Sequence, residues 1–232
     1  MILDLHPEIS IQKLTVGIDK APLLVIDNFV ADPDRLVRRA VTRMYGQGGR
    51  YYPGIRAEAP LSYQQLFTGK LRNLLFEYFG LSGSGLKFSL CHYSVVTLPG
   101  EKLEFLQRVP HFDSTNRNGL ASVHYLFRGN LGGTAFYRHR STGFECIDES
   151  RKARYFEILN QESAGPDAPA AGYINGDTPL FEQIGKQDGV FNRILIYPRN
   201  ILHSGDLAPD FVPDPNPATG RLSINTFIDV LP

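Results

Sequence analysis

The second half of this 232-residue sequence is a series of short segments rich in Val, Ile, Tyr and Phe, separated by Gly, Pro, Asn and Asp. Segments of this composition are typical of strands, and the residues between them favour turns. They cover residues 86–97, 121–128, 133–139, 190–197 and 221–230. Short strands without a regular alternation of helices favour a β-sandwich or jelly roll over a parallel α/β sheet.

The N-terminal part has a different pattern. Residues 23–30 (LLVIDNFV) form a strand-like run, after which Asp32 can cap a helix whose first residue is Pro33. The helix would have one apolar face, made of Leu36, Val37, Ala40, Val41 and Met44. A second helix is predicted over about 62–79, ended by Gly80. We therefore expect an α+β fold, mainly β, in which N-terminal helices flank the sheet.

Length and composition favour one domain over the whole chain, 1–232. Hydrophobic residues make up 42% and charged residues 21%, which is the usual globular mixture, and a single core can be this large. The expected parts are an N-terminal strand with supporting helices at 21–80 and a jelly-roll core at 86–230. Residues 141–189 would form an insert in that core, with a helix near 149–160.

The charge balance limits the partners. There are 24 Lys and Arg against 24 Asp and Glu, so no overall field attracts phosphates, and we expect neither a nucleic-acid nor a membrane partner. The start of the chain, Met1 to Asp4, lacks the basic and then apolar pattern of a secretory signal. Two cysteines are too few for a disulfide framework, so we expect a cytoplasmic protein. The sequence leaves a homodimer open.

Three residues suggest a metal site. His111 and Asp113 are two apart in an extended segment, where side chains of that spacing point to the same side. His203 follows the apolar strand residues 194–196 and could supply a third ligand. Two imidazoles and one carboxylate, with other positions open, form the ligand set of non-heme Fe(II) oxygenases.

The last predicted strand carries polar residues on one face. Arg221, Ser223 and Asn225 alternate with apolar residues, so this face lines a polar cavity or meets water. The arginine fork pairs bidentately with carboxylates. An organic acid bound near the metal would need such a partner.

In this order, four motifs resemble those of the Fe(II)- and 2-oxoglutarate-dependent dioxygenase superfamily, and most nearly its prolyl-4-hydroxylase-like branch. The motifs are His111-x-Asp113, Gly132-Gly133-Thr134-Ala135-Phe136, His203 and Arg221-x-Ser223. The resemblance spans roughly residues 21–230 and implies a double-stranded β-helix, which is a cupin-like jelly roll.

The same resemblance implies the roles of the site residues. His111, Asp113 and His203 would bind Fe(II), and Arg221 would pair with the distal carboxylate of 2-oxoglutarate, assisted by Ser223. Tyr93 would also touch 2-oxoglutarate.

The implied reaction consumes O2, converts 2-oxoglutarate to succinate and carbon dioxide, and hydroxylates a substrate. Because Asp113 leaves no ligand position for halide, hydroxylation is favoured over halogenation. The substrate is a small molecule, a peptide or a carrier-bound intermediate. His124, Tyr137 and Arg138 are candidate substrate contacts, with a core histidine and a solvated strand end as the alternatives.

Two other classes of function remain open at the level of sequence. One is a cupin-like metal-binding protein, such as a hydrolase or isomerase, that uses the same triad without 2-oxoglutarate. The other is a binding or scaffolding protein that only keeps the fold. Arg221 bears on the first alternative, because a protein without a dicarboxylate co-substrate does not need a buried guanidinium there.

Overall fold

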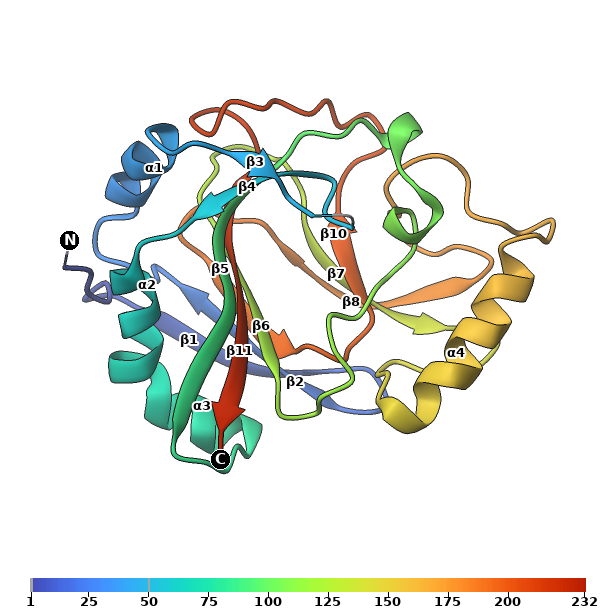
Figure 1. Cartoon of the computed structure of the whole chain (residues 1–232), viewed down its shortest axis with the longest axis horizontal. Helices are drawn as coiled ribbons and strands as arrows, with labels where there is room; N and C mark the ends of the chain where they lie inside the picture. The colour runs from blue at the N-terminus through green and yellow to red at the C-terminus, as the bar shows by residue number, and fades with distance from the viewer. Residues whose placement is uncertain (1, 50) are drawn as a thin grey trace.

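A computed structural model describes residues 2–49 and 51–232, so Met1, part of the N-terminal segment considered above, lies outside the described residues. The described strands form two antiparallel sheets (Figure 1). The large sheet has the order β1 (Ser10–Val16), β2 (Ala21–Asp27), β9 (Ile194–Pro198), β6 (Leu120–Tyr125), β11 (Leu222–Leu231), β5 (Gly85–Val96), β4 (Gly54–Glu58) and β3 (Gly46–Gln47). The small sheet has the order β10 (His203–Asp206), β7 (Gly133–His139) and β8 (Phe181–Asp188). The fold is mainly β and of the jelly-roll type.

Side chains on the large sheet alternate between two apolar cores. On β9, Ile194 and Ile196 pack into the core on the outer face, whereas Leu195 and Tyr197 pack into the core between the sheets. Both faces of this strand are buried, which explains its continuous apolar sequence. The inner core also contains Phe136 of β7, which meets Tyr197 edge to face across the sandwich.

The N-terminal helices cover the outer face of the large sheet (Figure 1). They are α1 (Pro33–Val41), α2 (Leu61–Gln65) and α3 (Arg72–Phe79), and a π-helical stretch, Leu66–Leu71, joins the last two. α4 (Glu149–Glu162) packs beside the small sheet through Tyr155 and Leu159. Two 3-10 turns, Gly100–Lys102 and Phe105–Gln107, lie in the connection between β5 and β6.

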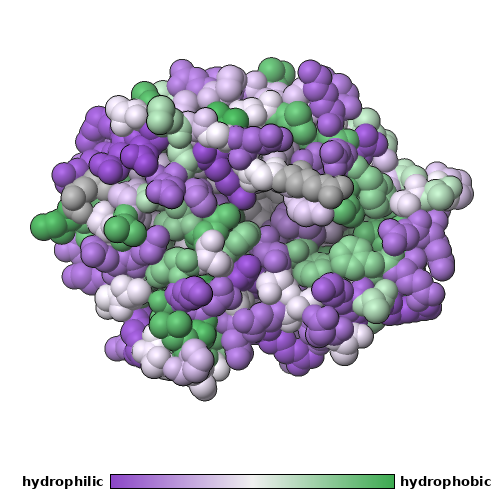
Figure 2. Space-filling model, in the orientation of Figure 1, coloured by the Kyte–Doolittle hydropathy of each residue, from purple (hydrophilic) through white to green (hydrophobic). Residues whose placement is uncertain are grey.

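Helix α1 begins as predicted and ends earlier than its apolar pattern indicated. The Asp32 side chain accepts a hydrogen bond from Arg35 N, which caps the helix before Pro33. Leu36 and Ala40 are buried, but the helix ends at Val41, and Met44 is 95% exposed. Hydrophilic side chains cover the outer surface of α1 (Figure 2).

The segment expected to be an insert supplies part of the sheet. Residues 141–189 include β8, which pairs along the length of β7, so the insert is shorter than predicted. The strands β1, β3, β4 and β10 were also not predicted. They are short or polar, as in HSGD of β10 and SIQKLTV of β1, and their pairing comes from neighbours distant in sequence.

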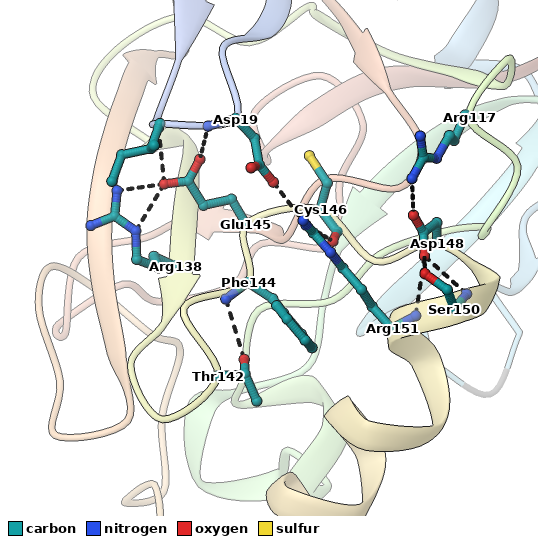
Figure 3. Close-up of polar contacts among 11 residues, drawn as sticks. Asp19, Arg117, Arg138, Thr142, Phe144, Glu145, Cys146, Asp148, Ser150 and Arg151 are labelled. Carbon is teal, nitrogen blue, oxygen red and sulfur yellow. Dashed lines mark hydrogen bonds and ion pairs between the residues drawn. The ribbon is translucent and has the colours of Figure 1, made fainter.

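A buried carboxylate ties the β1–β2 turn to the loop before α4 (Figure 3). Glu145 accepts hydrogen bonds from the backbone N–H groups of Ile18 and Asp19, at 3.1 and 2.9 Å, and it pairs with Arg138. Gly17 has φ +69°, and a Cβ there would lie 2.0 Å from a Glu145 carboxylate oxygen. Only glycine therefore allows both the turn and this approach.

The two cysteines, Cys91 and Cys146, are free. Within residues 2–49 and 51–232, the helices are too short or too polar to cross a membrane.

Asn192 provides the first test of the fold. It has φ +64°, and its side chain bonds both Val30 N and Val30 O, at 3.0 and 2.9 Å. Asn192→Ala leaves these buried groups unpaired, so we expect a loss of about 2–4 kcal/mol in unfolding free energy. Asn28→Ala is the matched control, since Asn28 also has positive φ but is exposed; chemical denaturation should show it to cost clearly less.

The buried side chain of His124 should make the folded protein less stable in acid. Burial lowers its pKa to about 3, so the unfolded chain binds a proton below about pH 6.5 that the folded protein excludes. The free energy of unfolding therefore decreases as the pH is lowered, by about 1.5 kcal/mol between pH 6.5 and pH 5 from this group alone. We expect His124→Gln to have a shallower pH dependence of unfolding free energy in this window. Parallel curves for the two proteins would refute the assignment.

Candidate active site

Three side chains form the centre of the site. Nε2 of His111 lies 3.8 Å from one Asp113 oxygen, and Nε2 of His203 lies 3.6 Å from the other. One potential ligand atom from each of the three residues lies within 4.8 Å of the others. The structure thus brings together the three predicted ligands, although His203 is 92 positions from His111 in the chain.

Backbone hydrogen bonds fix this arrangement. His111 N donates to His203 O, and His203 N donates to His111 O, both at 2.9 Å. This bridge adds the His111 segment to the free edge of β10, while β7 pairs with the other edge. Asp113 N donates to Arg199 O at 2.8 Å. This bond holds Asp113 beside the chain segment that leads into β10.

The donor atoms suit a divalent metal. His203 Nδ1 lies 2.9 Å from Ile201 O; because a carbonyl only accepts, Nδ1 carries the proton and Nε2 keeps its lone pair. Asp113 Oδ2 is buried without a hydrogen-bond partner. An unpaired buried carboxylate oxygen is costly, and a cation bound between the three residues would satisfy it.

The pKa shifts of Asp113 and His111 fit a metal site between the three residues. Burial raises the pKa of the Asp113 carboxyl, against the opposing effect of His203 and two arginines, Arg199 and Arg56. Desolvation and then the neighbouring His203 hold the pKa of His111 well below its usual value. His111 is therefore neutral at pH 7, as a metal ligand must be, although 52% of its side chain is open to the cavity.

The triad lies in the wall of a cavity of about 630 Å3. The walls include many aromatic side chains together with a few polar groups. They include Tyr52, Arg56, Phe112, Phe156, Tyr173 and Arg221. This size and lining are typical of a small-molecule site.

Arg221 lies in the same cavity and is 6% exposed. Nε donates to Leu131 O at 2.9 Å and one terminal nitrogen to Gly133 O at 2.7 Å. Its neighbours Tyr125 and Phe127 are aromatic, and it forms no ion pair with an Asp or Glu of the described chain. A buried guanidinium bonded only to neutral groups is suited to binding an anion.

The Gly132-Gly133 pair explains how Arg221 is seated. A Cβ on Gly132 would lie 2.1 Å from Asp206 O, and one on Gly133 would lie 2.0 Å from Gln187 O. The absence of side chains lets the start of β7 fit between β8 and the end of β10. The carbonyl of Gly133 is then available to Arg221.

Tyr93 does not lie in the cavity, contrary to the expectation. It is buried on the outer face of β5, in the core beneath the helices. Its neighbour Ser94 faces inward, since its hydroxyl meets Arg56. Ser223 lies on the same face of β11 as Arg221, and its hydroxyl donates to Asn225 Oδ1 at 2.8 Å.

The three predicted substrate contacts also lie elsewhere. His124 is a core histidine, stacked on Tyr63 and bonded to Asn192 on the outer face of the large sheet. Tyr137 is buried in the core beside α4. Arg138 is engaged by Glu145 and Glu182. None of the three predicted residues borders the cavity.

Two cavity residues were missed by the sequence analysis. Tyr52 has a buried hydroxyl without a hydrogen-bond partner, and its ring lies under the Arg56 guanidinium, 4.0 Å from the ring centre. Burial raises the pKa of Tyr52, which keeps the hydroxyl protonated as a donor. Both residues come from a Gly- and Tyr-rich stretch that has no strand-like or helical pattern, so only the fold reveals their position.

Residues 7–228 match the model of a family of unknown function, DUF6445. The chain belongs to this family. A search of curated proteins gives no match.

Solved structures resemble the DUF6445 protein in fold. HygX from Streptomyces hygroscopicus, with nickel, 2-oxoglutarate and hygromycin B bound, is 10% identical, with a TM-score of 0.50 over 91% of this chain and 84% of its own. An N-substituted L-amino acid dioxygenase from Burkholderia ambifaria AMMD is 9% identical, with a TM-score of 0.45 over 97% and 95%. The fold of HygX supports the jelly-roll description.

Metal binding can be measured without a substrate. We expect Ni(II), at about 100 times its dissociation constant, to raise the Tm of the DUF6445 protein by about 5–10 °C. His203→Ala and Asp113→Ala should abolish this rise because each removes one of three ligands. His92→Ala, on β5 and outside the triad, is the control and should keep it. A full rise in either triad variant would exclude this site.

Proposed function

We propose that the DUF6445 protein is a non-heme Fe(II)- and 2-oxoglutarate-dependent oxygenase that hydroxylates an organic substrate. One observation carries the proposal: an open-sided His–Asp–His triad and a buried guanidinium without an acidic partner line the same cavity. In this proposal His111, Asp113 and His203 hold the iron. Arg221 pairs with the distal carboxylate of 2-oxoglutarate.

The residues present fit both groups. The triad supplies two imidazoles and one carboxylate, a set suited to Fe(II). Around Arg221 the charge requires an anion, and the hydroxyl of Tyr52 is an additional donor near that guanidinium. Tyr52 thus takes the place that the sequence analysis gave to Tyr93.

When bound, the iron supplies dioxygen activation: O2, 2-oxoglutarate and a substrate C–H bond give succinate, carbon dioxide and the hydroxylated substrate. The chain's own contribution is orientation and exclusion of water. Arg221 holds the co-substrate at one end, and the backbone bridge between His111 and His203 fixes the ligands at the other. Aromatic walls keep the cavity dry.

The cupin-like alternative lacks a reason for Arg221. A hydrolase or isomerase with this triad would bury an uncompensated guanidinium in its active cavity, at a cost on the order of several kcal/mol per buried ion even after relaxation of the surroundings. The prolyl-4-hydroxylase-like branch remains a proposal that rests on the motif order in the sequence.

The decisive experiment is an anaerobic titration of the Fe(II)-loaded protein with 2-oxoglutarate, followed by visible absorption. A metal-to-ligand charge-transfer band that saturates, and that is lost in His203→Ala, supports the proposal. Bound iron without this band would favour the cupin-like alternative. Absence of iron binding would favour a scaffolding role.

Arg221→Ala should weaken 2-oxoglutarate binding about 10- to 100-fold, because it removes a hydrogen-bonded charge pair, while iron affinity is unchanged. The charge-transfer titration measures the first quantity and calorimetry with Ni(II) the second. Arg128→Ala, which removes an exposed arginine paired with Asp34, is the control and should leave both values unchanged. Equal co-substrate affinity in Arg221→Ala and wild type would refute the role of Arg221.

A further inference from the structure

A second guanidinium, that of Arg56 on β4, borders the cavity without an acidic partner. Nε donates to Ser94 Oγ at 3.3 Å and Nη1 to Gly48 O at 3.2 Å. Both acceptors are neutral, and Arg56 forms no ion pair with a described carboxylate. The Tyr52 ring beneath it and these two bonds hold the guanidinium in place.

The cavity as a whole has an excess of positive charge, although the chain is neutral. Its described lining includes the cations Arg56, Lys152 and Arg221, and a single carboxylate, Asp113. Lys152 has an acidic neighbour, with its Nζ 3.9 Å from a Glu149 oxygen. A divalent metal on Asp113 and a dianionic co-substrate on Arg221 would leave the charge of Arg56 without a counterion.

Tyr52 lies close to both guanidinium groups. Its ring lies against Arg56, and the positive charges of both Arg56 and Arg221 act on its hydroxyl, lowering its pKa against the larger effect of burial. Arg56 belongs to β4 and Arg221 directly precedes β11, and the two have different hydrogen-bond partners. They therefore offer two anion positions in one cavity.

One wall of the cavity is mainly apolar. Phe112 and Phe156 lie in contact, with ring centres 5.8 Å apart, and Tyr155 and Leu159 of α4 continue this wall. Arg56 lies on β4 and the aromatic wall includes residues of α4, so the lining combines a cationic group and an aromatic surface from different elements. An occupant that matches both has an anionic end and an apolar body.

We propose that Arg56 is the substrate anchor, and that the substrate is a small organic acid whose carboxylate or phosphate pairs with Arg56 while its apolar body lies against the aromatic wall. This inference rests on the proposed function, because it assigns Arg221 to 2-oxoglutarate. It narrows the substrate class from any organic molecule to amphiphilic anions.

The test is calorimetry on the protein loaded with Ni(II) and saturating 2-oxoglutarate. Three probes share an aromatic body: 4-phenylbutyrate, its neutral analogue 4-phenylbutyramide, and phenyl phosphate. We expect at least one acid to bind about 10-fold or more tightly than the amide, because it gains a charge-assisted pair. The stronger of the two acids identifies the anionic group.

Arg56→Gln should abolish the preference for the acid, and Arg56→Lys should keep part of it. The 2-oxoglutarate titration of the Fe(II)-loaded variant serves as the folding control and should again give a charge-transfer band that saturates. Equal binding of acid and amide to wild type, failure of both acids to bind, or an unchanged preference in Arg56→Gln would overturn the inference. A loss of 2-oxoglutarate binding in Arg56→Gln would also overturn it, because Arg56 would then hold the co-substrate.

The same measurements separate this inference from the proposed function. If wild-type protein gives no charge-transfer band with 2-oxoglutarate, the proposed function fails whatever the probes do. If the band forms but the probes show no charge preference, the proposed function stands and only the role of Arg56 is refuted.

Discussion

The reciprocal backbone hydrogen bonds between His111 and His203 are the interaction on which the site depends. They join a loop to the edge strand of the small sheet and thereby close a 92-residue separation. No side chain is needed for this pairing, so the ligands themselves remain free to face the cavity. A further backbone hydrogen bond, from Asp113 N to Arg199 O, positions Asp113 in the same way and leaves its carboxylate free.

The arginines in the cavity lack the ion pairs that stabilise several charged groups elsewhere in the described chain. Elsewhere, the buried Glu145 pairs with Arg138, and Arg193 pairs with Asp27. In the cavity, Asp113 has a buried oxygen without a hydrogen bond, and Arg56 and Arg221 lack carboxylates. Such sites cost stability in the free protein and lower the cost of binding oppositely charged ligands.

Much of the fold could be predicted from local pattern. The strand at 133–139, the cap at Asp32 and the helix from Glu149 were found because periodicity and capping are properties of neighbouring residues. β8 and β10 were missed because their polar sequences become strands only through partners far away in the chain.

The site shows the same limit. The order of motifs in the sequence singled out the His–Asp–His cluster and Arg221 of the cavity, whereas Tyr93 was misplaced because adjacent residues of β5 face opposite sides of the sheet. Tyr52 and Arg56 have no local signature at all, and only the three-dimensional structure brings them to the cavity.

The position of Arg56 on β4 has an evolutionary consequence. β4 pairs with the two-residue strand β3 at the rim of the large sheet, whereas His203 lies on β10, which pairs with β7 and with the His111 segment. If Arg56 anchors the substrate as proposed, substitutions in this peripheral hairpin would change which molecule binds while the triad and Arg221 stay the same. Specificity would then evolve at the edge of the sheet independently of the metal site.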